Sequence, residues 1–145
     1  MLLLCTLGCS SRFWAAASGT YACEAAVSET TCGRTYANTS REVTLQGGGT
    51  DVMSLEAPAS SSISGSGPWG SVQFGAQADP EVYRGTGGMS CGGDSVTYTQ
   101  RAALTSVGTG RVAMTVRFDY GPTAAACGGV AGCRLVYDVT CTRVR

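Results

Sequence analysis

Two long runs of alternating residues constrain the fold of this chain most strongly. From Val96 to Leu104, and again from Val112 to Tyr120, every second side chain is mainly apolar and the residues between are mainly small, polar or charged. That period of two is typical of β-strands with one face in a core and the other in water. The two runs flank Gly108-Thr-Gly110, so they predict a β-hairpin.

The same alternation, in shorter stretches, recurs along most of the chain. Gly- and Ser-rich segments separate the stretches, and no convincing helix is predicted. Residues 57–67 are expected to form a mobile loop and residues 85–94 a Gly-rich loop. About eight strands are predicted, at residues 20–27, 41–45, 51–55, 71–77, 81–84, 96–104, 112–120 and 134–145.

Strands with one apolar and one polar face predict an all-β fold with an antiparallel sheet. An up-and-down barrel or a flattened sandwich fits about eight strands at meander-like spacing. The barrel is preferred because closing the sheet removes its exposed edges. At 145 residues the chain is long enough for one such domain and too short for two.

Eight cysteines in so short a chain indicate disulfides formed in an oxidising compartment. No Cys-x-x-Cys pair occurs, so the usual zinc and thioredoxin spacings are absent. If Cys5 leaves with a signal peptide and Cys9 carries lipid, an even number remains, which permits bridges without a free thiol. The six that remain are Cys23, Cys32, Cys91, Cys127, Cys133 and Cys141.

Two pairings follow from the predicted topology. Cys127 and Cys133 flank a Gly-rich loop, so a local bridge between them is expected, worth roughly 2 kcal/mol in the loop-entropy model. Cys23 and Cys141 lie on the first and last strands, which are neighbours in a closed barrel, so a bridge would seal that seam and contribute roughly 5 kcal/mol. The remaining pair is Cys32 with Cys91.

The N-terminus has the organisation of an export signal. Leu2 to Leu7 is a short apolar stretch, and Thr6-Leu7-Gly8-Cys9 is similar to the lipobox at which bacterial prolipoproteins are cleaved and lipidated. Thr6 departs from the usual leucine, and no basic residue precedes the stretch. We predict a signal peptide at 1–8, a lipidated Cys9 with a tether to residue 19, and a β domain at 20–145. The alternatives are secretion with cleavage near residues 15–18, and an unprocessed N-terminal strand.

A resemblance supports the lipoprotein interpretation. The Leu-rich start with Gly8-Cys9-Ser10, the opening strand Gly19–Cys23 and the ending Val139–Arg143 resemble the organisation of small uncharacterised lipoproteins of high-GC Gram-negative bacteria. The resemblance implies β structure and attachment to the cell envelope. Ser10 after Cys9 would then favour the outer membrane over a periplasmic or secreted state. The resemblance implies no activity and no functional residues.

The composition excludes several kinds of chemistry. The chain has no histidine, which removes the commonest general base and metal ligand. Ten arginines balance ten carboxylates, so no basic footprint for nucleic acid exists. Gly88-Met-Ser90-Cys-Gly92 matches the G-x-S-x-G pattern, but a nucleophile elbow needs a strand, a following helix and a histidine. No enzyme activity, cofactor or metal site is predicted.

Carboxylates are the remaining candidates for catalysis or cation binding. Glu24, Asp119 and Asp138 fall on polar strand faces, where cross-strand pairing with arginine explains them better than glycoside hydrolysis. A second group occupies loops, where turn formation is a better explanation than Ca²⁺ binding. These loop residues are Asp51, Asp79 and Asp94.

The leading functional hypothesis is a lipid-anchored binding module for a small apolar ligand or an envelope protein. A small barrel can hold one ligand inside. The aromatic residues expected to line such a site are Trp69, Tyr83, Tyr98 and Phe118. The alternatives are a structural or interaction lipoprotein with a filled core, and a secreted carboxylate-dependent hydrolase.

Overall fold

The computed structural model describes residues 18–48, 52–56, 63, 67–69, 72–75, 82–108 and 110–145. The side chains of 46–48, 52–56, 72–75, 82–84 and 107 are not described. The predicted signal peptide, Cys5, Cys9 and nearly all of the tether lie outside these residues. The strands are β1 (Gly19–Thr30), β2 (Thr39–Gly48), β3 (Val52–Glu56), β4 (Val72–Gly75), β5 (Val82–Cys91), β6 (Asp94–Gly108), β7 (Arg111–Tyr120) and β8 (Arg134–Arg143).

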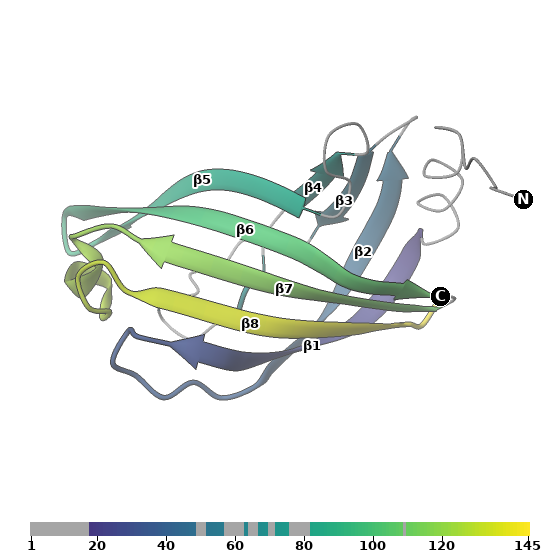
Figure 1. Ribbon diagram of the computed structural model, residues 1–145, viewed down its shortest axis with the longest axis horizontal. Coiled ribbons are helices and arrows are strands. Elements are labelled where there is room, and N and C mark those ends of the chain that lie inside the picture. The colour runs from purple at the N-terminus through teal and green to yellow at the C-terminus, as the bar shows by residue number, and fades with distance from the viewer. Residues whose placement is uncertain are drawn as a thin grey trace, which may run out of the picture.

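The eight strands form one antiparallel sheet in the order β4-β3-β2-β1-β8-β7-β6-β5. The sheet curls round so that its two edge strands, β4 and β5, approach one another (Figure 1). This is the neighbour order of an up-and-down barrel, with β1 and β8 joined directly. Among the described residues, no hydrogen-bonded ladder joins β4 to β5. The predicted all-β antiparallel fold of about eight strands is therefore confirmed.

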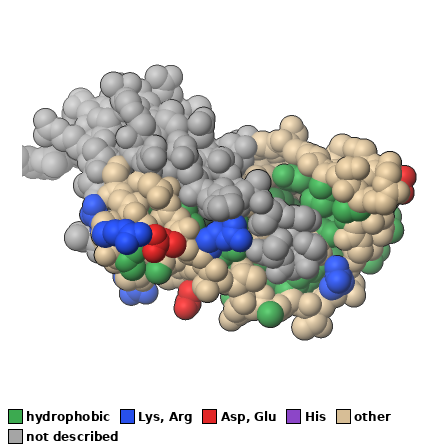
Figure 2. Space-filling model, turned by 180° about the vertical axis from the view of Figure 1, so that it is seen from behind, with side chains coloured by type: hydrophobic (Ala, Val, Ile, Leu, Met, Phe, Trp, Pro, Cys, Tyr) green, Lys and Arg blue, Asp and Glu red, His purple; other side chains and the backbone are tan. Residues whose placement is uncertain are grey.

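The core lies on the concave side of the sheet. Alternate residues of β7 from Val112 to Tyr120 are buried, and the residues between them are not. In β1, Tyr21, Cys23 and Ala25 alternate in the same way with more exposed neighbours. Seen from behind, hydrophobic side chains gather on the concave side of the molecule (Figure 2). Binary alternation therefore places the core face of these strands as predicted.

Residues 57–67 depart from the predicted mobile loop where the structure describes them. Ile63 has no exposed surface and belongs to the core cluster. The guanidinium of Arg34 donates to the Ile63 carbonyl oxygen at 3.4 Å. Trp69, just beyond this segment, is also in the core. A single isoleucine among serines and glycines is a weak sequence signal, yet burying it is favourable by about 2 kcal/mol.

The predicted Gly-rich loop at residues 85–94 is wrong over most of its length. Residues 85–91 continue β5, paired with β6 up to Cys91 opposite Asp94. Gly87 lies opposite Tyr98, and a Cβ at Gly87 would meet the Tyr98 ring at 2.5 Å. The tyrosine ring thus covers the glycine backbone. Glycine has no side chain to pack in a strand, and the Tyr98 ring from the neighbouring strand fills that space.

The seam prediction is confirmed, because Cys23 and Cys141 form a disulfide between β1 and β8. The other two predicted pairings are wrong: Cys32 bonds Cys133, and Cys91 bonds Cys127. Three disulfides indicate an oxidising compartment outside the cytosol.

The loop after β7 explains the two unexpected bridges. It contains the short 3₁₀ helix η1 (Ala124–Cys127). The Gly121 amide donates to the Thr97 carbonyl oxygen, and the Thr123 hydroxyl donates to that of Ser95. The loop is therefore folded over the start of β6. This path places Cys127 beside Cys91, at the turn of the β5–β6 hairpin.

Cys133 lies at the other end of this loop. The next residue is Arg134, and its carbonyl oxygen accepts a hydrogen bond from the Thr31 amide. That contact places Cys133 beside Cys32, immediately after β1.

Candidate functional site

The convex face of the sheet carries a cluster of arginines and carboxylates over β5, β6 and β7. Residues 101, 117 and 119 point outward because their neighbours in the alternation are buried in the core. Register places Arg101 directly opposite Arg117, and Arg84 of β5 directly opposite Arg101. Arg101 and Arg117 are thus two outward arginines in directly opposed positions on β6 and β7. Like charges in directly opposed positions disfavour a sheet unless something compensates.

Asp119 supplies part of that compensation. The Arg117 guanidinium donates to both carboxylate oxygens of Asp119, with N–O distances of 2.6 and 3.0 Å. Arg134, its cross-strand partner on β8, donates Nε to the same carboxylate at 2.9 Å. Arg134 also lies 3.5 Å from Glu29. Hydrogen bonds from Arg117, with a further contribution from Arg134, hold the pKa of Asp119 below its usual value.

We call Arg101, Arg117, Asp119 and Arg134 the arginine face. A depression of about 600 Å³ lies over part of it, and it is bordered on the β5 side by Gly85 and Thr86. Thr99 of β6 pairs with Thr86 and lines the same depression. Two hydroxyl groups, two guanidinium groups and the Asp119 carboxylate therefore border one hollow, and the carboxylate oxygens already accept hydrogen bonds from Arg117 and Arg134. Hydroxyl and guanidinium groups are hydrogen-bond donors that suit an anion.

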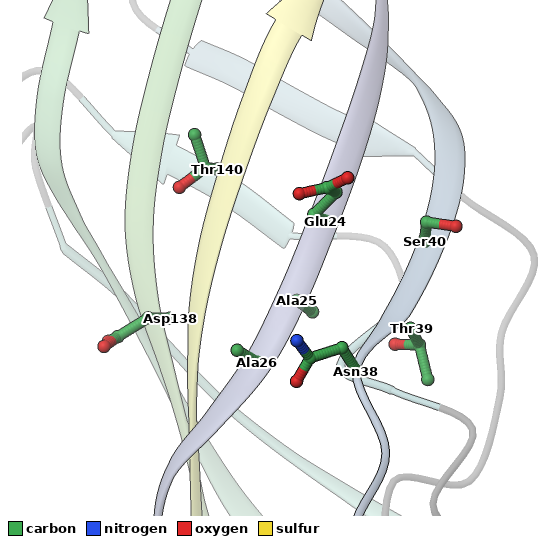
Figure 3. Close-up of a pocket in the computed structure, with 8 residues that line it drawn as sticks. All are labelled: Glu24, Ala25, Ala26, Asn38, Thr39, Ser40, Asp138 and Thr140. Carbon is green, nitrogen blue, oxygen red and sulfur yellow. The ribbon is translucent and has the colours of Figure 1, made fainter.

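A second depression, of about 340 Å³, lies on the same outer face over β1, β8 and the start of β2. Glu24 and Asp138 line it, together with Asn38, Thr140 and neighbouring small residues (Figure 3). The two carboxylates point apart in this view (Figure 3). Asp138 accepts a hydrogen bond from the Thr115 hydroxyl at 3.3 Å. A pair of carboxylates that flanks a scissile bond must converge on it, and these two do not.

Metal ligation has little support in the described part of the chain. No group of three Cys, Asp or Glu side chains there is arranged to hold a metal ion. Asp94 stands at the start of β6, opposite Cys91. Asp51 and Asp79 lie outside the described residues. The residues of Gly88–Gly92 continue from a strand into a turn and then into another strand, with Cys91 held in a disulfide, so the context is not that of a nucleophile elbow.

The residues predicted to line an apolar ligand site separate into two groups. Trp69 and Phe118 are buried in the core, with exposed fractions of 4% and 5%. Tyr98 is only partly buried; its ring packs edge-on against Phe118, with the two centroids 5.6 Å apart. Tyr83 is on β5, but its side chain is outside the described part. Met89, which the sequence analysis did not single out, is partly buried against the same core.

Sequence reasoning missed the arginine face as a unit. It interpreted Asp119 as a cross-strand partner of arginine, which is confirmed for Arg134 on β8. Arg117 also pairs with Asp119, but along the same strand, two residues before it on β7. The missing step was register. The hairpin turn places Arg101 opposite Arg117, and a β-bulge lies between Leu104 and Ser106, so counting back from the turn without that bulge would misplace the pair.

No model of a protein family matches the chain, and neither curated proteins nor solved structures gave a match. Among the described residues, no helix is long and apolar enough to cross a membrane.

Proposed function

We propose that this chain is a non-enzymatic binding module of the cell envelope, anchored to the outer membrane by lipid on Cys9. The observation that carries the binding role is the pair of depressions on the convex face. One of them is lined by Arg101 and Arg117, and among the described residues no carboxylate forms an ion pair with Arg101. Three buried or partly buried disulfides would keep such a module folded outside the cytosol.

The arrangement of the core favours an outer surface over an interior cavity as the binding region. Ile63 and Trp69, from outside the strands, join the strand side chains in one buried cluster. Phe118 contacts Tyr120 and Tyr137 within this cluster, so its ring has aromatic partners from the chain itself. These residues occupy space that an apolar ligand would need.

A small apolar ligand remains a second candidate because of Tyr98 and Met89. Both are partly buried against the core on the concave side, and both are near the edge strand β5. A purely structural lipoprotein with a filled core is the third candidate, and the burial of Ile63 and Trp69 favours it.

Thermal unfolding of the oxidised full chain tests the binding role. A ligand that binds only the folded state raises Tm as its concentration rises. The panel would hold inorganic phosphate, short carboxylates, anionic oligosaccharides, fatty acids and aromatic amines. A saturable rise with any class supports a binding module. A constant Tm across the whole panel would favour the structural lipoprotein.

Palmitate labelling tests the anchor. Wild type and Cys5→Ala should both incorporate label, because only Cys9 is expected to carry lipid. Cys9→Ala should incorporate none. Equal labelling of Cys9→Ala and wild type, or no labelling of either, would remove the lipid anchor from the proposal.

A further inference from the structure

The charge balance of the arginine face is incomplete in the described part of the chain. Asp119 accepts from Arg117 and from Arg134, and Glu29 pairs with Arg134. Within that part, Arg101 makes no ion pair, although it faces Arg117 directly across the ladder. Burying a guanidinium charge without a counter-ion is unfavourable, and the Arg101 side chain is accordingly exposed to water.

The geometry around Arg101 suits one kind of ligand. The depression that it lines also holds the hydroxyls of Thr86 and Thr99, which face one another across β5 and β6. The Asp119 carboxylate lies opposite Thr99 in the same depression, where its two oxygens already accept hydrogen bonds from Arg117 and Arg134. The planar fork of guanidinium groups binds oxyanions through paired hydrogen bonds. A tetrahedral oxyanion has enough oxygen atoms to accept from two arginines and two hydroxyls together, whereas a carboxylate has only two oxygens.

We propose that the depression between Arg101 and Thr86 binds a phosphate group, which bridges Arg101 and Arg117 and relieves their repulsion. This inference rests on the proposed binding function and names its ligand class. Thr86 and Thr99 donate their hydroxyl protons to the remaining phosphate oxygens. Asp119 keeps the Arg117 guanidinium in place by the contacts at 2.6 and 3.0 Å.

The phosphate could be free or part of a lipid headgroup. The site lies toward the end of the sheet where β8 begins, at Arg134, whereas the tether joins near Tyr21, which is opposite Arg143. Nine residues of strand separate these ends, about 30 Å at the rise of an extended chain. The site therefore lies at the opposite end of the sheet from the end at which the chain enters the domain, which favours a phosphate that is not in the anchoring membrane.

Two probes separate the sources. The oxidised full chain would be titrated with inorganic phosphate at constant ionic strength, with backbone and arginine Nε–H NMR shifts as the readout. A parallel flotation assay would use phosphatidylcholine vesicles with and without phosphatidic acid. Saturable shifts at Arg101, Thr86 and Thr99 with inorganic phosphate support the site as a free-phosphate site. Binding to the acidic vesicles alone supports the same chemistry in a lipid headgroup.

Matched charge variants make the test specific. Arg101→Gln should weaken binding about tenfold, the effect of losing one charge-assisted hydrogen-bonding group. Arg111→Gln removes the same charge from the same face of β7, but at its other end, and should leave the affinity within about twofold. Equal losses in both variants would show non-specific attraction and overturn the site. An unchanged affinity in Arg101→Gln, or no binding of either probe by wild type, would also overturn it.

Failure of this site and failure of the proposed function give different results. If neither inorganic phosphate nor the phosphatidic acid vesicles bind, but another class in the thermal panel raises Tm, the phosphate site is wrong and the binding role stands. If no class raises Tm, the binding role itself is wrong.

Discussion

Cys23 and Cys141 face one another directly across β1 and β8, with their Cα atoms 4.0 Å apart and a sequence separation of 118. A second bridge, Cys32–Cys133, joins the chain just after β1 to the chain just before β8. β1 and β8, the first and last strands along the chain, are thus joined by two disulfides in addition to their backbone ladder. Each bridge shortens the loop that the other closes.

The first prediction concerns the coupling of these two bridges. With Cys32–Cys133 intact, the loop closed by Cys23–Cys141 shrinks to roughly 18 residues, so its removal should cost about 3 kcal/mol in the loop-entropy model. Removing Cys32–Cys133 alone should cost a similar amount. Removing both should cost about 7–8 kcal/mol, more than the sum, because the last seam bridge closes a loop of roughly 65–85 residues even with Cys91–Cys127 intact inside it.

Urea unfolding of paired Cys→Ala variants would measure this coupling as differences in the free energy of unfolding. The Cys91–Cys127 pair serves as the control. Its loop, with a sequence separation of 36, lies inside both seam loops, so it leaves unchanged the short loop that either seam bridge closes while the other is intact. Its removal should add independently to either seam variant. Strict additivity of the two seam bridges would contradict the shared-loop argument.

The sequence could predict a bridge only where both cysteines lay on strands whose neighbours in the sheet were also predicted. Cys23 and Cys141 were predictable because alternation placed both on inward positions of the first and last strands, which are adjacent in a barrel. Cys127 was not, because the path of the loop after β7 depends on hydrogen bonds to Thr97 and Ser95 that no local pattern reveals. Proximity in sequence favoured Cys133 as its partner, and tertiary packing chose Cys91.

The second prediction concerns Gly87 and Tyr98. A Cβ at residue 87 would lie 2.5 Å from the Tyr98 ring, so Gly87→Ala must displace that ring and should lower the free energy of unfolding by about 1–3 kcal/mol. Near-UV circular dichroism should show the tyrosine signal change in parallel. Gly88→Ala is the matched control, because its nearest contact is a backbone oxygen at 3.5 Å. In a Tyr98→Ala background the cost of Gly87→Ala should largely disappear, and an unchanged cost there would refute the ring contact.

The third prediction is the pH dependence of the arginine face. The pKa of Asp119 is lowered, so the stabilisation from this group is fully present above about pH 4, the ordinary carboxyl value. It is lost as pH falls through the lower, folded-state pKa. Because both partners are more than a third exposed, the effect should be below about 1 kcal/mol.

Asp119→Asn should therefore reduce the free energy of unfolding at pH 7 and flatten its decline between pH 4 and pH 2. Asp138→Asn removes a carboxylate from the same convex face and provides the comparison. Chemical denaturation across that pH range would supply the measurement. A decline in Asp119→Asn as steep as in wild type would assign the acid sensitivity to other carboxylates.

The arginine face illustrates which part of a site the sequence alone can indicate. Alternation alone identifies Arg101 and Arg117 as outward residues, and composition alone predicts arginine–carboxylate pairing. Their direct opposition depends on the register of the β6–β7 hairpin, which is shifted by the irregularity between Leu104 and Ser106. A one-residue slip would reverse which side chains share a face, so a pattern that predicts strands does not predict which side chains meet.

The fourth prediction tests the burial of Ile63. Ile63 is fully buried and packs close to Gly129 and the Cys133 region, where an added Cβ on Gly129 would lie 3.1 Å from its Cδ1. Ile63→Ala should therefore lower the free energy of unfolding by about 2–4 kcal/mol, through lost burial and an unfilled cavity. Val130→Ala is the control, because Val130 is 48% exposed and its truncation should change stability by less than about 0.5 kcal/mol. Urea unfolding of the oxidised proteins gives both values. Equal, small effects would mean that Ile63 contributes little to the core.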